Sequence, residues 1–354
     1  MPFFYTILRI YPEKYLYLIH FRGLTPPSHS FSLLLMKFLS LLFALITCQL
    51  CLAQEATKAK KKPWPTVLKG KGHAKVIMPD SNSTAPFIYT TKSYRFISQQ
   101  QISKTKITKL AATAESVASA VSRIPLSLSA PSQSEAKPAI YIYNDEESYL
   151  KAGGAPASAG YYSGRKNAVF LRADKFLGKK KPNYQLLTHE LVHLNMHSII
   201  GYSRAWFSEG NADYFASAFY ATSSYNFTDM TRNIKNRARH FYPDNTIIEL
   251  PPLKEFVELD FRQWRKLNQQ LAPEDRYTPY LASLLIVHYF YHIDPDGREK
   301  IQTYLTALHQ RASNRKRRPS LEDQAHLFPA ADLNKIQTTI TTYWNKRGLK
   351  VKFQ

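Results

Sequence analysis

The order of the expected elements indicates an α+β fold, with strands in the first part of the chain and helices in the second. Short runs of strand composition occur between residues 87 and 171. From residue 183 onward, apolar residues recur mainly at helical spacing. The chain has 354 residues, 44% of them hydrophobic, which is enough for a sizeable core. We therefore expect a small N-terminal mixed sheet followed by a mostly helical C-terminal part.

The N-terminal residues have the pattern of an export signal. From Met36 the sequence MKFLSLLFALITCQLCLAQEA joins one lysine, an apolar run and a small residue at Ala53. This pattern predicts a signal peptide over residues 36–53 and a secreted or periplasmic protein without a membrane span after cleavage. Residues 1–35 are then an extension upstream of the true start. The alternative is a membrane anchor formed by residues 31–53.

The positions of the cysteines and the net charge limit the kinds of site and partner that the chain can have. Cys48 and Cys51 both lie in the expected signal peptide, so the remaining chain has no thiol for a disulfide, a nucleophile or a zinc site. The net charge of +22 predicts attraction to anionic partners or an anionic surface. The lysine-rich, proline-broken segment 54–80 has the composition of a basic flexible tether.

Residues 81–182 are expected to form an N-terminal α+β subdomain with an edge strand. A helix over 103–123 is closed by Pro125, and a short helix begins near Asp145. Two runs pair as a hairpin around residues 163–167. The expected strands are 87–89, 94–97, 139–143, 161–162 and 168–171.

The rest of the chain is expected to be helical. Asn183 is a suitable N-cap for a helix over 183–200, and Gly201 is a suitable stop. We expect residues 183–300 to form a helical catalytic subdomain and residues 301–354 to add C-terminal helices. The further expected helices are 208–222, 225–238, 278–292, 297–311 and 331–346.

The stretch THELVHLNMH places a metal-binding pattern on the helix over 183–200. His189 and His193 are four residues apart, so both imidazoles can reach one ion at the zinc–nitrogen distance of about 2.0–2.1 Å. Glu190 lies beside the first histidine, where it can take a proton from a zinc-activated water. The three residues form the HExxH pattern of zinc hydrolases.

A catalytic zinc ion needs a third protein ligand and an open position. His197 does not suit, because residues eight apart on a straight helix are about 12 Å apart along its axis. A third histidine of the HExxHxxGxxH type is excluded by Met196 and Ile199. Glu209 is the better candidate, because a carboxylate on the next antiparallel helix can return to the metal. Asp213, one turn later, can accept the free ring N–H of a ligand histidine.

The pattern HELVH followed by WFSEGNADYF resembles the gluzincin metallopeptidases, and within them the peptidase MA-like group of bacterial exported proteins. The resemblance covers about residues 139–290 and departs from the family at Ala205, where proline is frequent, and at Asp213, where glutamate is frequent. It implies a zincin-like fold, zinc and peptide-bond hydrolysis. The residues that match the family's second motif are Trp206, Glu209, Gly210, Ala212, Asp213 and Tyr214.

These expectations combine into a mechanism. One Zn²⁺ per chain is bound by His189, His193 and Glu209, with Glu190 as the general base for hydrolysis of a peptide or protein substrate. Tyr280 is a candidate donor for the oxyanion, with an apolar core position as the simpler alternative. The strand over 168–171 is either a cleft strand that binds an extended peptide or an ordinary edge strand.

Other functions stay open at this point. The chain is alternatively a non-catalytic module whose basic surface binds anionic envelope polymers or nucleic acid, or a zinc hydrolase that acts on a non-peptide amide. His288 and His292 are also four residues apart, but without an adjacent glutamate we expect them to be structural. The basic run 311–318 is expected to be a solvated face, so no specific nucleic acid is expected.

Overall fold

A computed structural model describes residues 63–126, 137–156, 158–178, 181–243, 246–314 and 318–354. The expected signal peptide (36–53), the upstream extension (1–35) and the alternative anchor (31–53) lie outside these residues. Within the described part of the chain, no helix is both long and apolar enough to cross a membrane.

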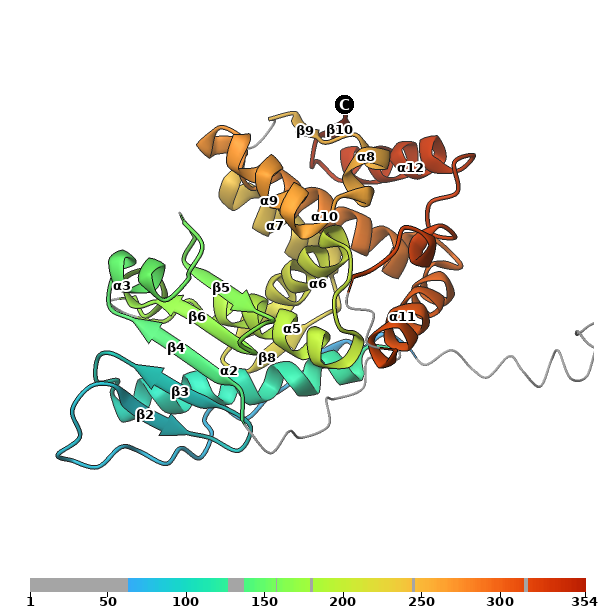
Figure 1. The fold of residues 1–354 in the computed structure, drawn as a ribbon. Coiled ribbons are helices and arrows are strands. Elements are labelled where there is room, and N and C mark those ends of the chain that lie inside the picture. Colours follow the sequence, from blue (N-terminus) through green and yellow to red (C-terminus); the bar gives the residue numbers. More distant parts are fainter. Residues whose placement is uncertain (1–62, 127–136, 157, 179–180, 244–245, 315–317) are drawn as a thin grey trace, which may run out of the picture. The chain divides into compact units, whose positions relative to one another are not determined.

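A five-stranded mixed sheet forms the N-terminal part, which bears out the α+β class (Figure 1). Its strand order is β2-β3-β4-β6-β5, with β3, β4 and β6 parallel and an antiparallel strand at each edge. Both alternatives for residues 168–171, a peptide-binding cleft strand and an ordinary edge strand, are therefore wrong. β6 (Ala168–Arg172) pairs on both sides, and β5 (Gly160–Ser163) is the edge strand. The other strands are β2 (Phe87–Thr90), β3 (Arg95–Ser98) and β4 (Ala139–Tyr143).

The two faces of this sheet bury different side chains, because successive residues of a strand point to opposite faces. One face belongs to the main core, which also contains apolar residues of α2 (Lys104–Arg123) and α5 (Tyr184–Ile200). The other face belongs to a separate small cluster with Tyr149 of α3 (Glu146–Lys151). The main-core side chains are Phe96, Ile140, Ile142, Val169 and Leu171, and the small cluster contains Ala139, Ala168 and Phe170.

Helix α5 has the ends that the sequence predicts. The Asn183 side chain accepts the backbone N–H of Leu186 at 3.0 Å, which caps the first turn. Gly201 ends the helix with φ of +66°, a conformation that favours glycine. The next helix, α6 (Ala205–Ala218), is buried along its whole length and packs against α5 and α10 (Thr278–His288).

A small sheet replaces parts of two predicted helices. β7 (Phe219–Ala221) and β8 (Ser224–Asn226) form a hairpin, where a helix was expected to run to residue 222 and another to begin at 225. Ser223 has φ of +57°, so no α-helix can continue through the turn. α7 begins only at Met230 and ends at Phe241, and the Asp229 side chain caps it.

The segment 63–80 departs from the expected free tether. β1 (Val67–Leu68) pairs with β8, and the Ile77 backbone bridges to Thr90 of β2. The Trp64 indole N–H donates to the Tyr214 hydroxyl at 2.6 Å. Composition alone predicted solvation, but these backbone pairs and the packed Trp64 hold the segment against the folded unit.

The C-terminal part contains two helices that the sequence pattern did not predict, α8 (Leu253–Glu258) and α9 (Phe261–Gln270). α10 passes into one π-helical turn over Tyr289–Ile293, which completes the expected helix over 278–292. The remaining elements are α4 (Ala173–Phe176), β9 (Ile248–Leu250), α11 (Gly297–Ser313), α12 (Leu333–Asn345), β10 (Val351–Phe353) and short 3-10 turns over Pro273–Asp275 and Glu322–Gln324.

Candidate metal centre

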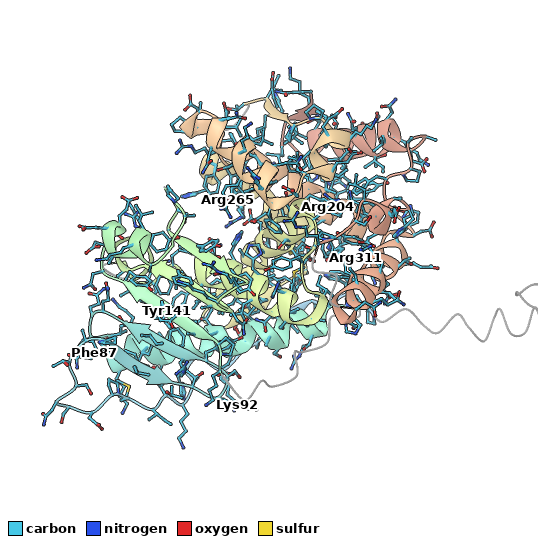
Figure 2. All side chains as sticks on the ribbon, viewed as in Figure 1. Phe87, Lys92, Tyr141, Arg204, Arg265 and Arg311 are labelled. Atoms are coloured by element: carbon cyan, nitrogen blue, oxygen red, sulfur yellow. The ribbon has the colours of Figure 1, made fainter. Side chains whose placement is uncertain are left out.

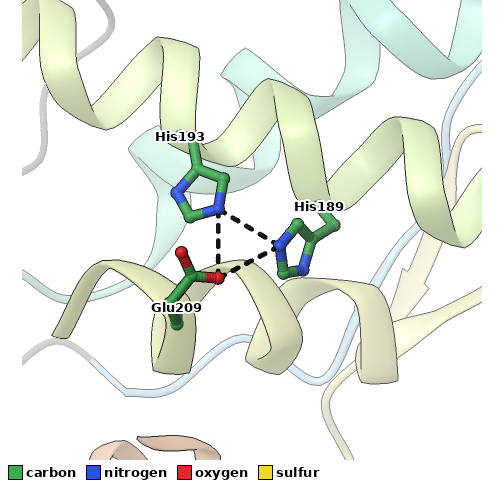
Figure 3. Close-up of side chains that lie close together, drawn as sticks. All are labelled: His189, His193 and Glu209. Atoms are coloured by element: carbon green, nitrogen blue, oxygen red, sulfur yellow. Dashed lines mark hydrogen bonds and ion pairs between the residues drawn. The ribbon is translucent and has the colours of Figure 1, made fainter. Parts of the chain in front are cut away.

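Helices α5 and α6 bring three candidate ligand atoms to one point (Figure 3). The Nε2 atoms of His189 and His193 lie 3.1 Å apart. Glu209 Oε2 lies 3.4 Å from the first of these atoms and 3.5 Å from the second. Two of the side chains come from successive turns of α5, and the third comes from the second turn of α6.

These separations fit a tetrahedral zinc site. Ligands at about 2.0–2.1 Å from a tetrahedral ion lie roughly 3.3–3.4 Å from one another. The three observed separations, 3.1, 3.4 and 3.5 Å, bracket that value. A single zinc ion can therefore contact all three atoms with little movement and keep a fourth position for water or substrate.

The Nδ1 atom of each histidine ring, on the side away from the common point, has its own hydrogen-bond partner. His189 Nδ1 lies 2.9 Å from Asp213 Oδ1, as the sequence led us to expect, and His193 Nδ1 lies 2.9 Å from Ser208 Oγ. When both Nδ1 atoms carry the proton and donate it, both Nε2 lone pairs face the common point. Such contacts fix the tautomer and ring orientation of metal-binding histidines. Ser208 is an addition to the predicted site.

Asp213 is held by two further donors that the sequence reasoning did not assign to it. The Arg237 guanidinium donates to Oδ1 at 2.6 Å, and the Tyr277 hydroxyl donates to Oδ2 at 2.8 Å. Arg237 comes from α7, beyond the β7–β8 hairpin, so no local spacing in the sequence indicates its role. Burial opposes ionisation of Asp213, but Arg237 and His189 outweigh it and keep the pKa of that carboxyl well below its usual range.

The candidate ligand side chains interact electrostatically with one another. Burial acts to lower the pKa of His189, but hydrogen bonds with Asp213 and Glu209 outweigh it and raise that pKa to about 10. Burial acts to raise the pKa of Glu209, but the two histidines outweigh it and lower that pKa to about 2. A proton on His189 therefore takes part of the role of a cation at this point, and a metal ion must displace it.

Glu190 lies beside the edge strand β5. The side chain is buried, which raises its carboxyl pKa against the opposing effect of His189 and His193. A raised pKa suits a group that accepts a proton and then passes it on. Gly160 of β5 makes room for this carboxylate, since a Cβ atom there would lie 3.0 Å from Glu190 Oε1.

Tyr280 lies close to the ligands, whereas Tyr277 is engaged by Asp213. The Tyr280 ring centroid is 6.3 Å from that of His189, and its side chain lines the same cleft. Burial, followed by the nearby carboxylates, raises the pKa of Tyr280 well above its ordinary value. The phenol therefore stays protonated and can donate a hydrogen bond. His197 contacts the rings of Tyr162 and Tyr202 at the cleft edge and is not among the three converging side chains.

A cleft of about 1620 Å³ lies between β5 and the helices α5, α6, α7, α9 and α10. The four residues of the predicted centre line it: His189, Glu190, His193 and Glu209. Arg265 of α9 and Arg204 before α6 also line this cleft and are labelled in Figure 2.

Two other sequence features have structural partners. His288 is buried beside Trp344, and His292 Nε2 lies 2.9 Å from the Tyr214 hydroxyl, in keeping with structural roles. Arg311, the first residue of the basic run, forms a two-point contact with Asp323 at 2.7 Å.

In comparisons with known proteins, no family model matches the chain, and no curated protein matches it in sequence.

Proposed function

We propose that the protein is an exported zinc metallopeptidase of the gluzincin type with a zincin-like fold. The observation that carries this proposal is the convergence of His189 Nε2, His193 Nε2 and Glu209 Oε2 within 3.1–3.5 Å of one another. The adjacent Glu190 and the match of the second helix to the gluzincin motif support it. Export rests on the signal peptide expected over 36–53.

His189, His193 and Glu209 would hold a zinc ion, which when bound would supply Lewis acidity toward the scissile carbonyl and toward water. Glu190 accepts the proton of the attacking water and delivers it to the leaving amine. Asp213 and Ser208 keep the ligand imidazoles in the required tautomer and orientation. Tyr280 is placed to donate to the developing oxyanion.

The edge strand β5 gives a reason to favour a peptide substrate. Its inner edge pairs with β6, and its other edge is not paired in the sheet of the described residues. An extended peptide can add its backbone to such an edge and pass Glu190 on the way. This geometry favours peptide-bond hydrolysis over hydrolysis of a small non-peptide amide.

The decisive test measures metal content and hydrolysis together. The wild type is expected to hold one zinc ion per chain, and Glu209→Ala to lose it or bind it much more weakly. Glu190→Gln is expected to keep zinc but to lose hydrolysis of a peptide library by a factor of about 10²–10⁴ or more. A wild type that binds no zinc after reconstitution would sink the proposal.

The second candidate is a non-catalytic module that binds anionic polymers through basic residues. The exposed arginines of the cleft favour it. It predicts salt-sensitive binding that survives Glu190→Gln and no hydrolysis by the wild type, so the same variant separates the two functions.

A further inference from the structure

The cleft carries positive charge that the metal centre does not use. Five of the arginines that line it are exposed, and within the described part of the chain none of them has an ion pair or side-chain hydrogen bond. They are Arg165, Arg262, Arg265, Arg276 and Arg318. Arg237, by contrast, is committed to Asp213. Five unused guanidinium groups in one cleft indicate a function in binding an anion.

Helix α9 presents two of these arginines on one face. Arg262 and Arg265 are three residues apart, and Asn268 and Gln269 continue the same polar stripe along the cleft. Trp264 of the same helix also lines the cleft, but it is only 5% exposed and anchors the helix. Figure 2 shows Arg265 on the side of α9 that faces the five-stranded sheet.

The anchor of α9 also sets its distance from the metal centre. The Trp264 ring lies edge-on to Tyr280, with centroids 4.7 Å apart, and Tyr280 lies 6.3 Å from His189. One tyrosine therefore separates α9 from a predicted metal ligand. Arg265, the next residue of α9, lines the same cleft as His189 and Glu209.

Arg276 lines the cleft beyond the end of α9. The Asn268 side chain donates to the Arg276 carbonyl oxygen at 2.6 Å, which ties this residue to the helix. Two carboxylates, Asp260 and Glu274, line this part of the cleft as well. Asp260 caps α9, where its side chain accepts the Gln263 N–H at 2.8 Å. Asp260 and Glu274 together offset two of the three positive charges of Arg262, Arg265 and Arg276, so this part of the cleft keeps a positive excess.

We infer that Arg262, Arg265 and Arg276, here called the arginine wall, select substrates with an acidic side chain close to the scissile bond. This inference rests on the proposed peptidase function. Guanidinium groups bind carboxylates in a two-point geometry and resist deprotonation. A peptide suits the cleft better than a nucleic acid, because the outer backbone edge of β5, unpaired in the sheet of the described residues, can pair with an extended peptide.

The test uses the full chain and two pools of quenched fluorescent peptides. The pools have equal length and the same apolar centre, which is flanked by glutamate in one pool and by glutamine in the other. The wild type should cleave the glutamate pool with roughly tenfold higher kcat/KM at low salt, and added salt should shrink this preference. Arg262→Gln/Arg265→Gln should bring the ratio of the two pools close to one.

Lys266→Gln is the matched control, because Lys266 is the exposed neighbour of Arg265 on α9 but does not line the cleft. It should leave the preference unchanged. Equal cleavage of both pools by the wild type overturns the inference and leaves the peptidase function standing. An equal effect of Lys266→Gln and the double variant also overturns it, since the cause is then general charge.

A binding measurement separates the two proposals. The Glu190→Gln protein is titrated into a fluorescein-labelled glutamate-rich peptide, its glutamine counterpart and an oligodeoxythymidylate of matched length. The inference is supported if the protein binds the glutamate peptide most tightly and loses this preference when the arginine wall is mutated. This holds even if neither pool is cleaved, because absence of cleavage refutes only the peptidase function. Tighter binding of the oligonucleotide assigns the wall to nucleic acid and overturns the inference.

Discussion

At the scale of single residues, the centre depends on one carboxylate with three donors. The Asp213 carboxylate accepts hydrogen bonds from His189, Arg237 and Tyr277, so both of its oxygens are engaged. Glu190 and Glu209 lie in the same buried region, and without Arg237 the carboxylates would repel one another in a poorly solvated space. The cation from α7 thus allows Asp213 to stay ionised and to hold the His189 ring in place.

Replacing Arg237 by glutamine should therefore weaken zinc binding from a distance. The variant leaves Asp213 without its cation and loosens the orientation of His189, and we expect zinc affinity to fall about 10–100-fold. Competition with a chromophoric chelator measures the change. Arg232→Gln is the control, because Arg232 lies on the same helix but is exposed, and among the described residues its side chain pairs with Asp229 alone. Unchanged affinity in Arg237→Gln would show that Asp213 needs no such support.

At the scale of elements, local signals and long-range contacts decided which expectations held. The ends of α5 were predictable, because Asn183 and Gly201 act within one turn of the helix. The β7–β8 hairpin was not, because its residues pair with β1, about 160 positions earlier in the chain. The contact between Asp213 and His189 was predictable from helix spacing. The contact between Arg237 and Asp213 was not, because it depends on the path of the chain through that hairpin.

The crossing of α6 and α10 depends on Gly210, which directly follows the predicted ligand Glu209. A Cβ atom at this position would lie 2.4 Å from the Ser283 carbonyl oxygen and 2.5 Å from Val287 Cγ2. The contact with Ser283 is with backbone and cannot relax without moving the helix backbone of α10. The glycine therefore sets how closely α6 approaches α10, and with it the position of Glu209.

Gly210→Ala should destabilise the protein by about 1–3 kcal/mol because of this overpacking. Helix propensity alone predicts the opposite sign, a gain of about 1 kcal/mol. The urea midpoint of the metal-free protein distinguishes the two, and Gly72→Ala serves as the control, since a Cβ atom at Gly72 would meet no atom within 4 Å. A midpoint at or above that of the wild type would contradict the close helix contact.

At the scale of the whole molecule, the segment 63–77 links the two parts of the fold. Trp64 contacts Tyr214 and Tyr291 in the helical part, while the Ile77 backbone pairs with Thr90 of the five-stranded sheet. Because the Tyr214 hydroxyl accepts the Trp64 N–H, its own proton is free to go to His292 Nε2, 2.9 Å away. His292 in turn lies against His288, with ring centroids 4.9 Å apart.

His288 makes the stability of this assembly sensitive to acid. It is 1% exposed, and within the described residues its Nδ1 atom has no hydrogen-bond partner. Burial, together with the charge of nearby groups, lowers the pKa of His288 well below its ordinary value of 6.5. The unfolded chain takes up a proton on His288 below about pH 6.5, whereas the folded chain does not. Stability from this residue is thus complete above pH 6.5 and falls as the pH decreases.

At pH 5.5 the loss should reach about 1 kcal/mol relative to pH 7.5. Urea unfolding of the metal-free protein at both pH values measures it, with chelator present so that zinc release does not contribute. In His288→Leu the difference between the two pH values should shrink by that amount, because the buried position no longer titrates. His240→Gln, at an exposed position of α7, should leave the difference as in the wild type. If His288→Leu also leaves it unchanged, the folded protein admits a proton at His288, and the acid sensitivity has another origin.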